Sequence, residues 1–337
     1  MIHIYDFLIQ TNTPMYKGEG ATMGGTERQI LTVAEQLANK GLNIGIIHSE
    51  TDGYDRIVNG VKHLNKYRHH YAQSKVRLTC SQLPYMHNIH RDFAMSGSHI
   101  PILSPLEINS AEKCYNWMHN WFPASNLIPR IFLSEATKKY QEKKNKNDLV
   151  IPYMIPNGLS HEPVNKRDNY VFWMSAMAKG LKEAILTYIA LYERGMRRPF
   201  YICIPPQRRK RDVEITEALI KDTNQHNYPI KFLGELQYNT AMTWLSRAAC
   251  LFRPSSPQET FGLVYLEANY LGVPVLTNSI DSAKEVIRDK NNMFIEKNTK
   301  IEDILEWQNN IEKKFTKVDL KKIGVEPITK KWMSLLE

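Results

Sequence analysis

The chain has 337 residues, 42% hydrophobic and 23% charged, a composition typical of globular proteins that excludes a disordered or fibrous chain. This length accommodates two domains, each with its own core. The net charge of +9 favours an acidic partner, but no basic run is interleaved with aromatic residues, so nucleic acid is not the expected one. We find no transmembrane helix, signal peptide or metal-like cysteine spacing, and we expect a cytoplasmic protein with reduced thiols.

The chain opens with a pattern typical of a parallel sheet. His3–Ile9 is predicted to be a buried strand, and a glycine-rich loop follows it. A helix is then expected from Thr26, whose hydroxyl is a suitable N-cap, with Gln29 completing a capping box. Leu42–His48 is predicted to be the second strand, so the segment forms a β-loop-α-β unit.

The remainder of the first hundred residues gives a weaker pattern. We predict one strand at Val58–Leu64 and another at Val76–Cys80, joined by polar turns. Histidines are concentrated between His63 and His90, and His87 lies three residues before the last of them. No acidic or cysteine partner is near in sequence, so we expect no metal site there.

A further strand is predicted at Lys113–Trp121, with His119 near its carboxyl end. A histidine at that end of a parallel strand is placed to meet a ligand, and a satisfied core histidine is the equally compatible alternative. Another strand is expected at Ile131–Ser134. The lysine-rich Lys138–Lys146 after it is either a solvated helix or a surface that touches anionic lipid.

Pro156 and the turn-forming pair Asn157–Gly158 are typical of a linker, so we place a domain boundary between residues 155 and 156. The second half then alternates strands and helices, which predicts a second doubly wound domain. Its expected strands are Tyr170–Met174, Phe200–Ile204, Ile230–Leu233, Cys250–Phe252, Val273–Leu276 and Met293–Ile295, and its expected helices are Leu181–Arg194, Val213–Lys221, Thr240–Arg247, Gly262–Tyr270, a short one near Lys284–Ile287 and one from Ile301.

Two acidic residues lie in the strand–loop–helix–strand segment from Phe252 to Thr277: Glu259 in the loop and Glu267 in the second turn of the helix. A phosphate would bind between them at the positive end of the helix dipole, on the N–H groups of Thr260, Phe261, Gly262 and Leu263. A ligand with a sugar, a diphosphate and a ribose would fit, with each carboxylate accepting hydrogen bonds from paired hydroxyls. Taken alone, two acids at this spacing are more simply solvated residues of an ordinary helix.

The letters of this segment, E-x-F-G-L-x-x-x-E followed by G-x-P-V, resemble the signature of the retaining, nucleotide-sugar-dependent glycosyltransferases of family four. GGTER at residues 24–28 and IPNG at residues 155–158 resemble further motifs of that family. The resemblance implies an α/β chain with the GT-B fold, two Rossmann-like doubly wound domains facing a central cleft. Residues 1–155 would form the acceptor-side domain and residues 156–324 the nucleotide-sugar domain, with a final helix at about residues 325–337 packing back onto the first.

The resemblance also assigns roles to individual residues. Glu259 would hold hydroxyls of the transferred sugar, Glu267 those of the ribose, and Lys179 would contact the donor diphosphate. His119 would hydrogen-bond the sugar or the phosphate, and its action as a general base is left open. Backbone facing the donor would come from Gly24, Gly25, Thr260, Phe261, Gly262, Leu263 and, in a loop against the nucleobase, Gly234.

The chain departs from the family at Met174, where members carry an arginine for the phosphates; Arg253 or Arg208, at strand ends, could replace it.

The implied activity is transfer of a sugar, with retention and without metal or cofactor, from a UDP-sugar or GDP-sugar to a hydroxyl of a glycan, lipid-linked or protein-linked acceptor. The alternatives are a GT-B relative that lost transfer and binds nucleotide-sugar or glycan, and a GT-B epimerase or phosphorylase. Peripheral contact with the cytosolic face of a membrane stays open.

Overall fold

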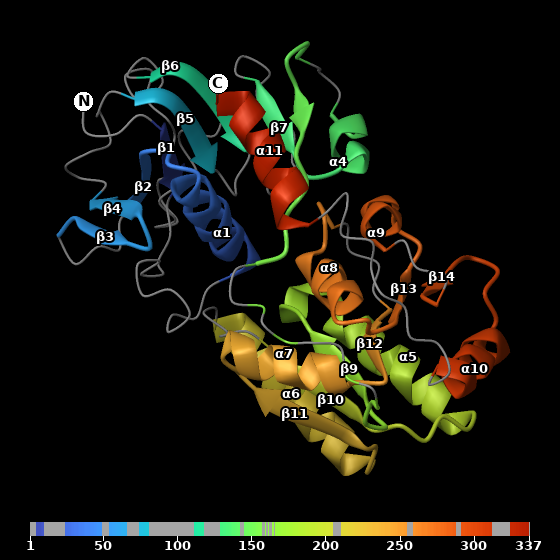
Figure 1. The fold of residues 1–337 in the computed structure, drawn as a ribbon. Coiled ribbons are helices and arrows are strands. Elements are labelled where there is room, and N and C mark those ends of the chain that lie inside the picture. Colours follow the sequence, from blue (N-terminus) through green and yellow to red (C-terminus); the bar gives the residue numbers. More distant parts are fainter. Residues whose placement is uncertain are drawn as a thin grey trace, which may run out of the picture. The chain divides into compact units, whose positions relative to one another are not determined.

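The computed structural model describes residues 5–9, 24–48, 54–65, 74–80, 111–117, 129–141, 145–156, 159, 161, 164, 166–204, 210–254, 259–287, 291–311 and 324–336 (Figure 1). The chain divides into two compact units, one comprising Met1–Pro156 with Leu320–Glu337 and the other Asn157–Asp319. The division falls one residue after the boundary expected from the proline and the turn pair. Across the described residues, no helix combines the length and hydropathy needed to cross a membrane.

The first unit contains a sheet with the order β3-β4-β2-β1-β5-β6-β7-β8, parallel except between β3 and β4. In the centre of this sheet Leu8 is in register with Ile47 on one side and with Thr79 on the other. The strands are β1 (Tyr5–Ile9), β2 (Ile44–His48), β3 (Arg56–Val58), β4 (Val61–Asn65), β5 (Ser74–Cys80), β6 (Ala111–Trp117), β7 (Arg130–Phe132) and β8 (Leu149–Val150).

The strand predicted at Val58–Leu64 is confirmed from Val61 onward, as β4, but its first residues are wrong, because the chain folds there into a hairpin of β3 and β4. Val58 pairs with Val61, and the two residues between them, Asn59 and Gly60, have φ values of 51° and 79°. Positive φ at both central residues matches the twist of a two-residue hairpin, and the pair Asn-Gly adopts it at little cost. The antiparallel edge of the sheet follows from this turn.

Helix α1 (Gly25–Asn39) begins two residues earlier than an N-cap at Thr26 predicts, so Thr26 lies inside the helix. The N-cap is Gly24, in an extended conformation and without a side-chain capping bond. Gln29, expected in a capping box, is instead fully buried: its amide Nε2 donates to the Met154 carbonyl at 2.8 Å, and the Met154 N–H donates to its Oε1 at 3.1 Å. Both polar groups of the side chain are therefore satisfied by the segment that leads out of the unit.

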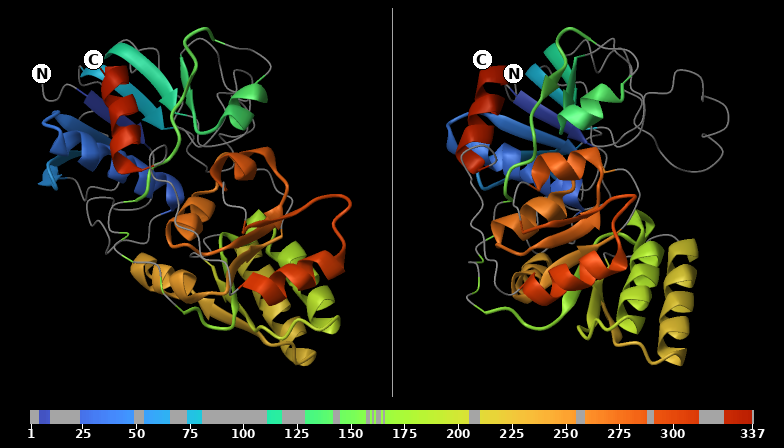
Figure 2. Two further views of the ribbon diagram at one scale, coloured as in Figure 1. Left: turned by 45° about the vertical axis from the view of Figure 1, so that its right-hand side comes forward. Right: turned by 90° about the vertical axis from the view of Figure 1, so that its right-hand side faces the viewer.

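The last helix of the chain, α11 (Val325–Leu336), returns to the first unit and lies beside α1 (Figures 1 and 2). Its Trp332 and the strand residue Trp117 are both fully buried, with ring centroids 4.7 Å apart in an edge-on arrangement. The ring of Tyr153 is also edge-on to Trp117, with ring centroids 6.4 Å apart. A helix that buries its tryptophan in this way adds a large apolar area to a core built from distant parts of the chain.

Between β7 and β8 the chain forms the short helix α4 (Glu135–Lys139), which contains only the first two residues of the helix considered at Lys138–Lys146. Ser134 is its N-cap and accepts a hydrogen bond from the Thr137 N–H. Near it, Arg130 and Asp148 form an ion pair at 2.6 Å with both side chains 1% exposed. Burial alone would raise the pKa of Asp148, but the hydrogen bonds from Arg130 and from the Asn145 N–H, together with the charge of Arg130, outweigh it and hold that pKa below its usual range.

The second unit contains a parallel sheet with the order β11-β10-β9-β12-β13-β14. The alternation of strands and helices agrees with the sequence prediction, with boundaries that move by a few residues. The strands are β9 (Val171–Met174), β10 (Phe200–Cys203), β11 (Ile230–Gly234), β12 (Cys250–Arg253), β13 (Val275–Asn278) and β14 (Met293–Ile295), and the helices are η2 (Met177–Lys179), α5 (Leu181–Glu193), α6 (Lys210–Gln225), α7 (Tyr238–Arg247), α8 (Leu263–Tyr270), α9 (Asp281–Val286) and α10 (Ile301–Asn310).

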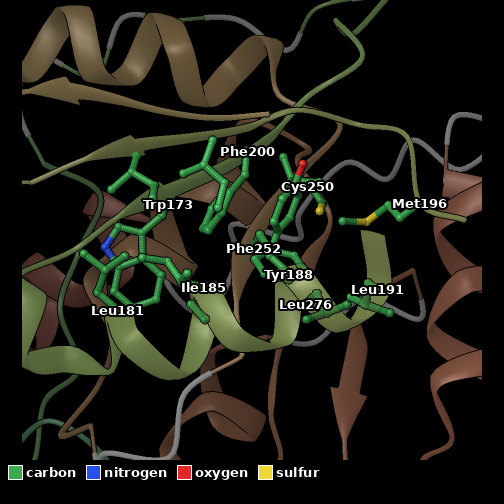
Figure 3. Packing of buried hydrophobic residues seen from close by; sticks show 14 of the residues in the cluster. Trp173, Leu181, Ile185, Tyr188, Leu191, Met196, Phe200, Cys250, Phe252 and Leu276 are labelled. Carbon is green, nitrogen blue, oxygen red and sulfur yellow. The ribbon is translucent and has the colours of Figure 1, made fainter. Parts of the chain in front are cut away.

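The core on one face of this sheet is organised around α5 (Figure 3). Leu181, Ile185 and Tyr188 follow helical spacing and are at most 3% exposed. They pack against Phe200 and Phe252, which point to the same face from β10 and β12, the strands on either side of β9. Because side chains alternate along a strand, the residue after Phe252 points to the opposite face.

Stability should depend on pH through His63, which is fully buried in β4. Burial, together with the charge of Arg56, lowers the pKa of His63 from 6.5 to about 4. The unfolded chain therefore binds a proton below pH 6.5 that the folded protein refuses until about pH 4, and unfolding is favoured as the pH falls between these values. We expect a loss of about 3 kcal/mol from this residue across that window.

The measurement is denaturant unfolding at several pH values for the native protein and for His63→Gln. The variant should show a weaker pH dependence between pH 6.5 and 4, whereas His226→Gln, at an exposed histidine, is the matched control and should follow the native protein. An unchanged pH dependence in His63→Gln would show that this histidine is not kept neutral by the fold.

Candidate active site

The turn from β12 into α8 is shaped by a glycine in the left-handed region. Gly262 is the N-cap of α8, with φ 83° and ψ 69°. A Cβ at this position would lie 2.4 Å from Cδ2 of the Tyr265 ring, so no other residue fits without displacing that ring. The helix then begins at Leu263. The Tyr265 N–H donates to the Gly262 carbonyl at 2.9 Å, whereas the N–H groups of Leu263 and Val264 before it have no carbonyl to reach within the helix. This is the arrangement that was expected to hold a phosphate.

Glu259, just before this turn, accepts contacts from two cations. Its Oε1 pairs with Nζ of Lys179, and its Oε2 lies 3.2 Å from Nη2 of Arg253. The Glu259 side chain is 9% exposed, that of Arg253 1% and that of Lys179 43%. One carboxylate between two cations leaves a net positive charge, with the lysine at the surface and the arginine in the interior. Such a site favours an anion that approaches from the lysine side.

Lys179 is positioned by the turn that follows β9. It is the last residue of the single-turn helix η2, which Gly180 ends in the left-handed conformation at φ 95° before α5 begins. Lys179 is 80 residues away from Glu259 in the chain, yet β9 and β12 are neighbours in the sheet. The carboxyl ends of two adjacent parallel strands therefore bring the lysine and the glutamate together.

Arg253, the last residue of β12, is held on the α8 face of the sheet. Its Nη1 donates to the Tyr265 hydroxyl, which in turn lies 2.9 Å from Oγ1 of Thr277. Its guanidinium carbon also lies over the rings of Tyr265 and Trp173, at 5.0 and 5.9 Å from their centroids. The arginine was considered as a replacement for the missing phosphate cation, but its partners here are Glu259 and Tyr265.

The ionisation of Glu259 follows from these contacts. Burial alone would raise the pKa of this carboxyl, but the charges of Arg253 and Lys179 outweigh burial and hold the pKa below its usual range. The pKa of Arg253 is correspondingly raised by Tyr265 and Glu259, which outweigh the opposing effect of burial. Glu259 is therefore a carboxylate, and an acceptor of hydrogen bonds, at neutral pH.

Glu267, in the second turn of α8, is 3% exposed and accepts a hydrogen bond at 2.8 Å from the hydroxyl of Tyr238. Tyr238 is the first residue of α7, the helix that follows β11 and the predicted nucleobase loop. The alternative of two solvated helix glutamates fails, because neither acid faces water: taken as a whole residue, Glu259 is 7% exposed. Both carboxylates are instead fixed by neighbouring side chains.

The remaining predicted residues are placed as follows. Thr260 and Phe261 lie in the turn directly before Gly262, and Gly234 ends β11 with φ 70°. Gly24 and Gly25 lie at the start of α1 in the first unit. His119, Arg208 and the histidines from 69 to 90 are outside the described residues. Within the described residues, no cluster of three or more His, Cys, Asp or Glu side chains could hold a metal ion.

The sequence analysis missed Tyr265, Thr277 and Tyr238. Tyr265 lies three residues after Gly262, on the side of α8 that faces the sheet. Its burial could have been predicted from the sequence, because a helix that packs on a sheet buries the residues along one side. Thr277 lies in register with Arg253 on the adjacent strand. No comparable signal was available for Tyr238, which reaches Glu267 from a different helix.

Comparison with known proteins agrees with this geometry. Residues 207–315 match the family model for glycosyl transferases, group 1, which covers Arg253, Glu259 and Glu267 but not Lys179. No curated protein sequence matches the chain. Solved structures do match, over nearly the whole chain. The fold is GT-B.

Three of these solved structures illustrate the match. AviGT4, a glycosyltransferase involved in avilamycin A biosynthesis, has a TM-score of 0.67 at 12% identity, covering 99% of this chain and 97% of its own. Sucrose-phosphate synthase from Thermosynechococcus elongatus also has a TM-score of 0.67 at 12% identity, with coverages of 99% and 98%. Anabaena HepE in complex with UDP-glucose has a TM-score of 0.66 at 12% identity, with coverages of 99% and 99%.

We expect Gly262→Ala to damage the site and the stability of the second unit. The substitution costs about 1 kcal/mol for the left-handed backbone and about 2 kcal/mol more for the contact with the Tyr265 ring, which is buried and hydrogen-bonded. The control is Gly195→Ala, also at positive φ but with nothing within 4 Å of the added Cβ. Chemical denaturation should show the larger loss at Gly262; equal losses would mean that the Tyr265 ring can move aside.

Proposed function

We propose that the protein is a retaining glycosyltransferase that moves a sugar from a nucleotide-sugar donor to an acceptor hydroxyl without a metal ion. The observation that carries the proposal is the ionised Glu259 beside Lys179 at the start of α8. It lies within the segment that matches the group 1 glycosyl transferases. A surface-facing cation, a helix N-terminus and a buried acceptor together suit a diphosphate joined to a sugar.

The difficult step in such a transfer is departure of the diphosphate, as the bond between the anomeric carbon and the β-phosphate oxygen breaks. Negative charge grows on that oxygen while the sugar becomes oxocarbenium-like. Lys179 and the first-turn N–H groups of α8 would stabilise this charge more strongly in the transition state than in the bound donor. This is the electrostatic work that a metal ion performs in other transferases, so we propose that none is needed.

The two buried acids would orient the donor from either side of the diphosphate. Glu259 would accept hydrogen bonds from hydroxyls of the sugar, and Glu267, held by Tyr238, from those of the ribose. Gly234 would lie against the nucleobase. Gly24, Gly25 and His119 remain predictions from the family resemblance, as does a glycan, lipid-linked or protein-linked acceptor. The cytoplasmic location remains a prediction from the composition of the chain.

Arg253 supports this function indirectly. Because its guanidinium is buried between Glu259 and the rings of Tyr265 and Trp173, it keeps Glu259 charged and in place. With no arginine at Met174, Lys179 is the proposed phosphate cation among the described residues; Arg208, the other candidate, lies outside them. A nucleotide-sugar-binding protein without transfer activity is the alternative that this departure favours.

Kinetics separate the two functions. Lys179→Ala and Glu259→Ala should each reduce turnover by about 100-fold or more, because each removes a charge that acts on the transition state. Lys182→Ala, at an exposed lysine in the first turn of α5, is the matched control and should retain native turnover. Normal rates in the two site variants would refute the assignment, and a strict requirement for added Mn²⁺ after EDTA treatment would contradict the metal-independent mechanism.

The donor should be identifiable from thermal unfolding with UDP, GDP and their sugars. A ligand present at about 100 times its Kd adds about 2.7 kcal/mol of stability, which corresponds to a rise in Tm on the order of 5 °C. Anabaena HepE was solved with UDP-glucose, so UDP-sugars are the first to test. The Glu259→Ala variant is the control and should lose the added stabilisation from the sugar; no response to any nucleotide would speak against a donor site.

A further inference from the structure

We propose that Lys179 exchanges partners when the donor binds: it leaves Glu259 for the diphosphate, and the carboxylate oxygen that it vacates receives the hydroxyls of the sugar. Arg253 stays on the other oxygen throughout. This inference rests on the proposed function, and it adds a coupling between the diphosphate and the sugar within one donor. The geometry points to it because the two cations on Glu259 differ in their freedom to move.

Each carboxylate oxygen of Glu259 has its own cation. Oε1 belongs to Lys179 and Oε2 to Arg253. The lysine side chain is 43% exposed and carries its ammonium on a flexible stem, so the ammonium can turn toward a ligand. The arginine is 1% exposed, donates to the Tyr265 hydroxyl and lies over two aromatic rings, so it has no second position available. One partner can leave and the other cannot.

Arg253 is also what makes the departure of Lys179 tolerable. A buried carboxylate without a counter-ion would be strongly destabilising, because its desolvation is not offset by any opposite charge. With Arg253 in place, Glu259 remains paired after the lysine has left. The pair between Lys179 and Glu259, in contrast, is partly screened by solvent on the lysine side, so losing it costs less. A diphosphate, with its greater negative charge, is able to outcompete it.

The exchange makes the site respond differently to the donor and to the spent nucleotide. A nucleotide-sugar takes Lys179 onto its diphosphate and offers hydroxyls to the vacated oxygen of Glu259, so both groups find new partners. A nucleoside diphosphate takes the lysine but leaves that oxygen with no replacement. Return of Lys179 to Glu259 therefore competes with the nucleoside diphosphate and favours its release after transfer.

The test is a double-mutant cycle on binding of UDP and GDP, measured by isothermal titration calorimetry with the native protein, Glu259→Gln, Lys179→Met and the double variant. The neutral amide of glutamine attracts Lys179 less strongly than the carboxylate does, so the lysine is released more easily to the diphosphate. Glu259→Gln should therefore bind the nucleoside diphosphate about 5-fold more tightly than the native protein. In the Lys179→Met background the same change should have no effect, because the competing pair is already gone. Lys179→Met alone should bind more weakly than the native protein.

Each other outcome has a defined meaning. If Glu259→Gln gains equally in both backgrounds, the gain comes from removing a negative charge near the phosphates, and the exchange is overturned. Weaker or unchanged binding in Glu259→Gln also overturns it, while leaving the proposed function intact. A native protein that binds neither UDP nor GDP nor their sugars overturns the proposed function and the exchange with it. If Glu259→Gln does not fold, the cycle is run with Glu259→Asp, which keeps a charge beside Arg253 and withdraws it from the lysine.

Discussion

The candidate site depends on a carboxylate that has been taken out of water and paired with two cations. Without Arg253 the ionised form of Glu259 would be too costly to bury, and a neutral acid would be a poor acceptor for sugar hydroxyls. Without Lys179 the cluster would carry no excess positive charge at the surface. The buried side of this cluster is fixed by the Arg253 guanidinium, by the two aromatic rings around it and by the hydroxyl of Tyr265. On its surface side, the Lys179 side chain pairs with Glu259 and has room to move.

The parallel sheet of the second unit assembles these groups from separate parts of the chain. Lys179 follows β9, Arg253 ends β12 and Thr277 lies near the end of β13, and these three strands are neighbours in the sheet. Since all strands run in the same direction, their carboxyl ends meet at one edge, where a ligand of an open α/β sheet binds. Helix α8 then adds Tyr265 from above the sheet and its own N-terminus beside Glu259.

The first unit is held together by contacts between distant segments. Gln29 joins α1 to the backbone at Met154, and Trp332 of the last helix packs on Trp117 of β6. These contacts place the segment that leaves the unit, at residue 154, and the segment that returns to it, after residue 320, on the same core. The chain crosses twice between the units, so the first unit is made of two separate stretches of sequence and the second of one continuous stretch.

The sequence by itself determined the parts of this protein that follow from local pattern. The α/β alternation of the second half, the helical stripe of α5 and the loop that carries Glu259 into a glycine-started helix were all readable, because apolar periodicity and glycine conformations are properties of short segments. The Asn59–Gly60 hairpin was readable for the same reason and was overlooked, since the apolar residues on its two sides resemble one strand. Only the tertiary structure decided the partners of the polar side chains. The N-cap of α1 is Gly24 and not Thr26, Gln29 hydrogen-bonds to Met154, and Arg253 pairs with Glu259 and Tyr265. The partner of a side chain depends on which face of its strand or helix another element covers. That element is far away in sequence, so local pattern does not reveal it.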